Sequence, residues 1–166
     1  FRSDLLENFG GHTYAAGLSL KEENLDAFTQ RFLKLAADEI IPEQMTPQID
    51  IDAVLDLQDI NAKFMSELKK MNPFGPDNQK PVFCSLGVKD YGTSKLVGKD
   101  LEHIKLELID DKSNTPIHGI AFGMHQHNTH IKNMKPFNIC YTIEENTYNG
   151  NTSLQLMVKD IKENDI

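Results

Sequence analysis

The chain has 166 residues, with 17 Lys and Arg against 25 Asp and Glu and a formal net charge of -8. Hydrophobic residues make up 39% and charged residues 25%, which argues against wholesale disorder, and no apolar run approaches the roughly 18 residues of a membrane span. Two cysteines, Cys84 and Cys140, cannot form a disulfide framework or a cysteine-based zinc site. We therefore expect a reduced, cytoplasmic setting and no membrane partner. Because the chain opens at Phe1 rather than Met, we expect it to be cut from something larger.

The first 46 residues predict a helix end, a glycine turn, a strand and a helix, in that order. Gly10 and Gly11 are expected to turn the backbone with positive φ, and the apolar run 14–20 predicts a buried strand. Ser19 and Glu22 have the spacing of a capping box. The following helix is predicted to reach about Ile40, because apolar residues recur at helical spacing at Leu25, Phe28, Phe32 and Leu35.

Two prolines mark the expected domain boundary, since Pro42 and Pro47 bracket a connector. We therefore divide the chain into residues 1–46 and 47–166. Beyond the boundary, alternation over 49–55 predicts a strand. Apolar residues that recur between Ile60 and Met71 predict a second amphipathic helix, which Pro73 ends.

The rest of the chain has a period of two, which is typical of β-strands. An irregular insert is expected at 125–134, and Asn149-Gly150 is a strong hairpin signal. Five or more short strands in this order favour a small closed antiparallel barrel of the OB type, with an open sandwich as the alternative. The predicted strands are 82–89, 91–97, 104–108, 117–122, 137–146 and 152–161.

An acidic chain lacks the basic face that is usual for nucleic-acid binders, but its acidity is uneven. Residues 112–143 contain no Asp or Glu, while they hold Lys112, Lys132, Lys135 and four of the six histidines. An anion could dock on this stretch without meeting local carboxylates. A loop that happens to lack acidic residues explains the same pattern.

Three further stretches have candidate roles beside architectural ones. The glycines of residues 9–12 would leave amides open to an anion, with His12 as a further donor, although a tight turn explains the stretch too. The proline-rich loop 73–83 favours a rigid brace between helix and barrel. Tyr148, at the expected hairpin tip, could stack on a base or cap the barrel.

A metal site and a catalytic site find little support. His125, His127 and His130 could ligate zinc or nickel only in an irregular loop, and no carboxylate lies near them in the sequence. No run of Asp and His suits a pair of divalent ions, and no Ser–His–Asp, Cys–His or phosphate-loop pattern occurs. Taken alone, the chain is not expected to be catalytic.

Read in order, these segments resemble the C-terminal part of the RecJ-type single-stranded-DNA-specific exonucleases, members of the DHH/DHHA1 phosphoesterase superfamily. Residues 9–12 and 15–18 are similar to the Gly-Gly-His motif of the DHHA1 domain. Further segments resemble motifs of the family's OB domain: the loop 73–83, Gly98-Lys99 with His103 and Lys105, residues 121–123 and residues 146–160. Two departures are the residues 77–79, where the family has Gly and Asn-Pro, and Tyr148, where Trp is common.

The resemblance implies an α+β fold: the end of a DHHA1 α/β domain over 1–46, then a helix and a five-stranded antiparallel OB barrel over 47–166. It implies a parent enzyme that degrades single-stranded DNA from the 5′ end, using Mn²⁺ or Mg²⁺ held by a DHH domain that this chain lacks. This fragment itself would need no cofactor. Gly10, Gly11 and His12 would contact the nucleotide near the scissile phosphate.

The same resemblance implies that the barrel guides single-stranded DNA, through cations and a stacking ring. The alternative is a protein-interaction module that docks a helicase or a single-strand-binding protein, which the net acidity favours. The residues expected to contact the DNA strand are Lys95, Lys99, His103, Lys105, Lys132, Lys135 and Tyr148.

Overall fold

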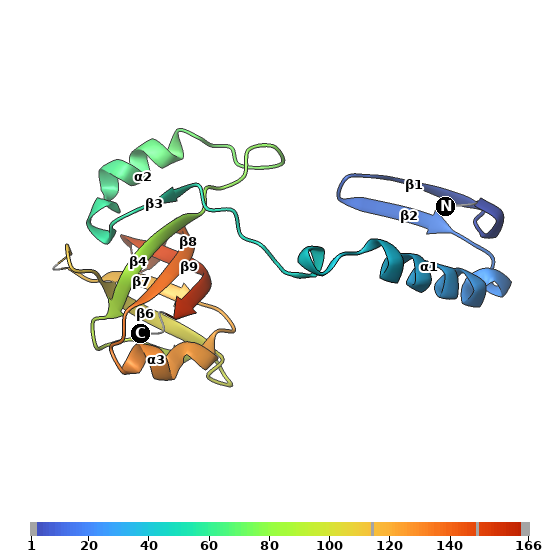
Figure 1. Cartoon of the computed structure of the whole chain (residues 1–166). Helices are drawn as coiled ribbons and strands as arrows, with labels where there is room; N and C mark the ends of the chain where they lie inside the picture. The colour runs from blue at the N-terminus through green and yellow to red at the C-terminus, as the bar shows by residue number, and fades with distance from the viewer. Residues whose placement is uncertain (1–2, 114, 149, 164–166) are drawn as a thin grey trace. The chain divides into compact units, whose positions relative to one another are not determined.

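The computed structural model describes residues 3–113, 115–148 and 150–163. The chain divides into two compact units, the first ending at Ile49 and the second beginning at Asp50 (Figure 1). Within the described residues, no helix combines the length and the apolar character needed to cross a membrane. Each unit is described by itself.

The first unit is a β-hairpin followed by a helix. Strands β1 (Asn8–His12) and β2 (Ala15–Ser19) pair in antiparallel fashion, after a short 3₁₀ turn, η1 (Ser3–Leu5). Two further 3₁₀ turns, η2 (Glu22–Asn24) and η3 (Pro42–Met45), flank helix α1 (Leu25–Glu39). The predicted helix is therefore confirmed, and it ends one residue before Ile40.

Three local predictions for this unit are wrong, two of them in the hairpin. Gly10 and Gly11 lie inside β1, and neither has a positive φ. Gly11 instead allows the two strands of the hairpin to approach closely, because a Cβ at this position would lie 2.6 Å from the carbonyl oxygen of Ala15. The run predicted as a buried strand is exposed along all five residues of β2.

The third wrong prediction is the capping box at Ser19 and Glu22, which is absent from the described helix start. Lys21 precedes η2 and Asn24 precedes α1, and neither side chain caps the helix. The side-chain amide nitrogen of Asn24 donates instead to the Leu5 carbonyl oxygen at 3.2 Å. This contact ties the helix start to η1, so a longer-range bond replaces the local cap.

The second unit opens with a short strand and a helix. Strand β3 (Ala53–Val54) is much shorter than the strand predicted over 49–55 and pairs in parallel with β4 (Phe83–Asp90). The 3₁₀ turn η4 (Leu57–Asp59) leads to helix α2 (Ala62–Lys69). Asn61 caps α2, since its side-chain oxygen accepts from the amides of Lys63 and Phe64.

The remaining strands form one sheet of order β3-β4-β8-β9-β7-β6-β5. An additional pairing joins β4 to β6, so the pairings of β4, β6, β7, β9 and β8 run in a circuit. A short irregular insert precedes β8, as expected from the sequence. The elements are β5 (Lys95–Val97), β6 (His103–Ile109), β7 (Ile117–Ala121), η5 (His125–His127), α3 (Asn128–Lys132), β8 (Phe137–Tyr148) and β9 (Asn151–Glu163).

The sheet is not purely antiparallel, which corrects the sequence-based expectation. Strand β9 pairs in parallel with β7 and antiparallel with β8. The chain crosses from the end of β7 to the start of β8 through η5 and α3, and the hairpin then returns alongside β7 in the same direction. A crossover connection of this kind is what a parallel pairing needs.

The core of the second unit lies inside this circuit of strands. Ile104, Leu106 and Leu108 on β6 are each 0% exposed, and they alternate with residues that face outward. Ile131 of α3 is also fully buried and joins the same cluster. The alternation on β6, the cleanest strand signal in the sequence, is thereby confirmed.

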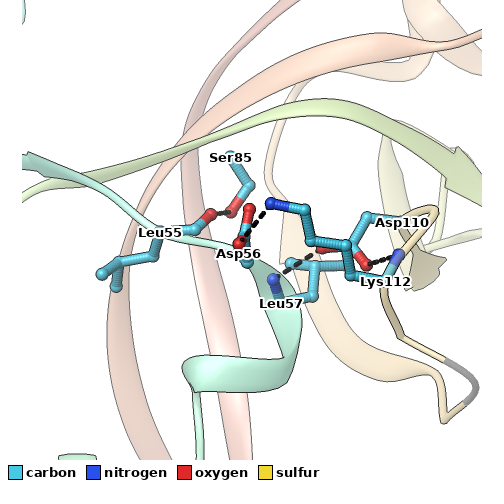
Figure 2. Close-up of polar contacts among 6 residues, drawn as sticks. All are labelled: Leu55, Asp56, Leu57, Ser85, Asp110 and Lys112. Carbon is cyan, nitrogen blue, oxygen red and sulfur yellow. Dashed lines mark hydrogen bonds and ion pairs between the residues drawn. The ribbon is translucent and has the colours of Figure 1, made fainter.

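A group of polar contacts holds the segment 55–57 against the sheet (Figure 2). Ser85 of β4 donates to the Leu55 carbonyl oxygen at 2.7 Å, and the Leu57 amide donates to Asp110 at 2.7 Å. Lys112 forms an ion pair with Asp56 at 2.7 Å. Ser85 lies 2.7 Å from the buried Tyr141 hydroxyl, so this contact reaches the core.

Candidate nucleic-acid interface

Two lysines lie directly opposite each other on the outer side of the sheet. Lys95 on β5 is the register partner of Lys105 on β6, and both are exposed. The neighbours of Lys105 along β6, Ile104 and Leu106, point into the core, so Lys105 points outward. Like charges in directly opposed positions destabilise a sheet. An anion held between the two ammonium groups would relieve this repulsion.

About half of the lysines of the second unit are held by carboxylates, and Lys95, Lys99 and Lys105 are not among them. Over residues 50–113, 115–148 and 150–163, no ion pair is found for these three. They lie on β5, on the loop 98–102 and on β6, which gathers three available cations in one region. The lysines held in ion pairs are Lys69, Lys70, Lys80, Lys89, Lys112 and Lys132.

Three carboxylates border this region: Asp100, which is exposed beside Lys99, and Glu102 and Glu107. Glu102 accepts from the Asp100 amide at 2.9 Å and lies 3.3 Å from Nε2 of His103. Its own backbone amide is the largest cause that lowers the pKa of the Glu102 carboxyl, and His103 adds to the effect. Glu107 contacts Thr93 and lies 3.6 Å from His118. The surface therefore combines free ammonium groups with these three carboxylates, which predicts modest anion affinity.

His103 occupies the start of β6 and contacts the end of β7. The Gly123 amide donates to Nδ1 of His103 at 3.1 Å, so that nitrogen acts as an acceptor. The imidazole also packs edge-on against Phe122, with ring centroids 4.9 Å apart and an interplanar angle of 79°. In this geometry the neutral ring carries its proton on Nε2. Sequence reasoning treated Phe122 only as a landmark and gave it no role.

The other two predicted phosphate contacts lie on and after α3. The Lys132 ammonium is 3.7 Å from Asp90, a carboxylate that is 1% exposed and also accepts from the Ser94 amide. This pairing gives Lys132 a structural role, because a buried carboxylate needs a compensating charge. Lys135 is exposed in the segment after α3. Neither lysine shares a strand pairing with Lys95 or Lys105.

The expected hairpin is present, since β8 and β9 pair from Phe137↔Glu163 to Tyr148↔Asn151. Gly150 has a φ of 80°, a left-handed conformation that glycine accepts without strain. Asn149 and the side chain of Tyr148 lie outside the described residues. The stacking role of Tyr148 therefore stays a prediction.

Two of the three histidines considered as metal ligands, His127 and His130, contact protein groups instead. Nδ1 of His127 lies 2.8 Å and Nδ1 of His130 lies 3.2 Å from the two carboxylate oxygens of Glu163. The other ring nitrogen of His130 contacts the Pro136 carbonyl oxygen at 3.2 Å. Among the described residues, no group of three His, Cys, Asp or Glu side chains could hold a metal ion.

The Gly-Gly-His residues lie at the end of β1 in the first unit. Gly10 pairs with Gly17 and Gly11 with Ala16, which brings the two backbones close together. His12 is exposed, and its Nδ1 accepts from the Tyr14 amide at 3.3 Å. This contact fixes one ring nitrogen of His12 as an acceptor. The nucleotide-contacting role of these residues stays a prediction.

The strand circuit, with Greek-key connections and a helix between its third and fourth strands, is the arrangement of the OB class. Comparison with known families agrees: the RecJ OB domain model matches residues 51–160. The chain belongs to the RecJ family.

Proteins from several bacteria are similar to this chain. The chain is 28% identical over 158 residues to the single-stranded-DNA-specific exonuclease RecJ of Salmonella typhimurium, with 95% of this chain and 27% of that protein covered. It is also 28% identical over 158 residues to RecJ of Bacillus subtilis, where 95% of this chain and 20% of that protein are covered.

Solved structures share the fold. RecJ from Thermus thermophilus in complex with Mg²⁺ covers 99% of this chain with a TM-score of 0.73 and 20% identity, and 24% of that chain is matched. The same protein in complex with Mn²⁺ gives a TM-score of 0.74 at 21% identity, again over 99% of this chain and 23% of that one. The chain thus spans about a quarter of the length of the proteins it matches.

Proposed function

We propose that the chain is part of a RecJ-type exonuclease and that its OB barrel binds single-stranded DNA and guides it toward a metal centre outside this chain. Residues 1–46 would form the end of the DHHA1 domain, with Gly10, Gly11 and His12 near the scissile phosphate. The parent enzyme would work in the cytoplasm, from the 5′ end, with Mn²⁺ or Mg²⁺. The family membership and the metal-bound relatives support this proposal.

The observation that carries the proposal is the opposed pair Lys95 and Lys105. In chain order, β6 and β7 are the second and third strands of the five-strand circuit. OB folds bind oligonucleotides on the face of these two strands and on the loops at 1–2 and 4–5. Lys105 lies on that face, Lys99 lies in the first of these loops and Tyr148 borders the second. Unpaired ammonium groups on this face suit a phosphate backbone.

The remaining candidate residues have weaker support. Lys135 is exposed and would add a phosphate contact, whereas Lys132 would have to leave the buried Asp90 carboxylate to do so. His103 would border the DNA path, where its Nδ1 accepts from the Gly123 amide and its ring packs against Phe122. We therefore rank Lys95, Lys99 and Lys105 above the others as phosphate contacts.

Fluorescence anisotropy with labelled oligo-dT at low salt tests the proposal. We expect weak binding whose affinity falls as salt rises, because each phosphate contact on a single strand contributes roughly 0.7 to the logarithmic salt slope. The double substitution Lys95→Gln with Lys105→Gln should lower that slope by about 1.4. A matched double substitution, Lys63→Gln with Lys162→Gln, removes two exposed charges elsewhere and should leave the slope unchanged.

Affinity that ignores both salt and the Lys95 and Lys105 substitutions would contradict DNA guidance by this face. That result would favour the alternative, a protein-interaction module. A pull-down of protein partners at physiological salt would be the next measurement.

A further inference from the structure

We propose that Phe122 is a base-stacking platform held in place by His103, so that the second unit grips a single strand by a nucleobase as well as by phosphates. This inference rests on the proposed function and adds to it a stacking residue and a positioning residue. Phe122 immediately follows β7 and is 54% exposed, although it is a large aromatic side chain. Its exposed ring is therefore available to a ligand.

The ring of Phe122 is braced by its neighbours. The imidazole of His103 packs against it edge-on at 4.9 Å. The Gly123 amide donates to Nδ1 of the same imidazole at 3.1 Å, and Gly123 has a φ of 68°. One histidine thus contacts both the aromatic ring and the backbone turn that follows it. Such bracing lowers the entropy lost when a ligand is stacked on the ring.

The platform lies beside the cations of the same face. Lys105 is two residues after His103 on β6, and both side chains point outward, which places them about 7 Å apart along the strand. Lys95 is opposite Lys105, and Val97 is opposite His103. A single strand lying along this face could place phosphates at the lysines and a base on Phe122. Aromatic stacking of this kind accepts any base, since every base has a π-face.

A tryptophan probe tests the contact directly. The chain contains no Trp, so Phe122→Trp places a single indole at the proposed platform. We expect oligo-dT to quench its emission, because an indole stacked on a base loses fluorescence. An abasic oligonucleotide of equal length carries the same phosphates and should bind without quenching. Equal quenching by both ligands, or by neither, would overturn the inference.

Affinity measurements separate an aromatic role from an apolar one. Phe122→Leu keeps an apolar side chain and should weaken oligo-dT binding roughly tenfold, whereas Phe122→Tyr should keep it. Neither change should alter the salt slope or the affinity for the abasic oligonucleotide, since the phosphate contacts remain. Thermal unfolding of each variant checks the fold. Full affinity in a folded Phe122→Leu protein would contradict the proposal.

The positioning role of His103 has its own readout. In the Phe122→Trp background, His103→Ala should speed the local motion of the indole in time-resolved anisotropy and reduce its quenching by oligo-dT. His103→Asn retains a side-chain acceptor near the position of Nδ1 and should restore part of both effects. Unchanged indole motion in the alanine variant would refute the brace.

The outcomes distinguish this inference from the proposed function. If the chain binds oligo-dT with the expected salt slope but Phe122 variants behave normally, only the platform is wrong. If the unmodified chain does not bind oligo-dT at low salt, the proposed function fails and the platform fails with it.

Discussion

The two units use similar elements but bury them very differently. In the first unit, no residue whose side chain the structure describes is buried, and Leu33 on α1 is 61% exposed. In the second unit, strands that pair in a circuit enclose a core whose central residues are 0% exposed. Apolar periodicity is present in both units, so periodicity alone does not produce a core. A core forms where elements pack their apolar faces against one another, as the strands of the second unit do.

Separating the two units is the most stringent test of this difference in burial. Residues 50–166 alone should unfold in one cooperative thermal transition at the temperature of the longer chain, because their core is internal. Residues 1–49 alone should show no cooperative transition, since they bury too little apolar surface to offset chain entropy. Circular dichroism during heating measures both, and a sharp transition in the short piece would refute the contrast.

A matched pair of substitutions tests the difference in burial at single residues. Leu106→Ala in the buried β6 row should lower the free energy of unfolding by about 2–5 kcal/mol, because it removes buried methyl groups and leaves a cavity. Leu33→Ala on the exposed side of α1 should change it by less than about 0.5 kcal/mol. Urea denaturation of both variants gives the two values. Equal losses would show that the first unit contributes to the same cooperative core.

A smaller effect is expected at the polar contacts of Figure 2. The Ser85 hydroxyl donates to the Leu55 carbonyl, so the Tyr141 hydroxyl must donate to Ser85. Ser85→Ala leaves both partners without their bond and should cost about 1–3 kcal/mol, whereas Tyr141→Phe should cost about 1 kcal/mol. Chemical denaturation compares them. A larger loss for Tyr141→Phe would reverse the assigned donor order.

The smallest expected effect is on pH dependence. Burial raises the pKa of the Cys84 and Cys140 thiols above their ordinary value of 9.0, and burial likewise raises the pKa of Tyr141. Above about pH 9, unfolded chains release these protons while folded chains retain them, so stability should fall as pH rises. Well below pH 9 both states keep the protons and these groups contribute no slope. Denaturation curves at pH 8 and 10 check the sign, and Cys84→Ala with Cys140→Ala should reduce the decline.

Sequence patterns predicted several elements of both units well and the charge pairing of the second unit poorly. The alternation on β6, the helix at 25–39 and the hairpin before β9 all depend on neighbours within a few residues. The glycine turn failed because β1 pairs with β2, so Gly10 and Gly11 became strand residues. For the candidate site, the opposition of Lys95 and Lys105 required the register of β5 and β6, which their spacing alone does not specify.

Most helices and strands and the family resemblance could be predicted from the amino-acid sequence, because periodicity, turns and short motifs are contained within the segments that show them. Which charged side chains form ion pairs depends on the folded structure. The stretch without acidic residues, 112–143, is met by carboxylates from elsewhere: Asp56 contacts Lys112, Asp90 contacts Lys132, and Glu163 contacts His127 and His130. Electrostatic pairing depends on distance in space, and folding sets that distance between residues far apart in the chain.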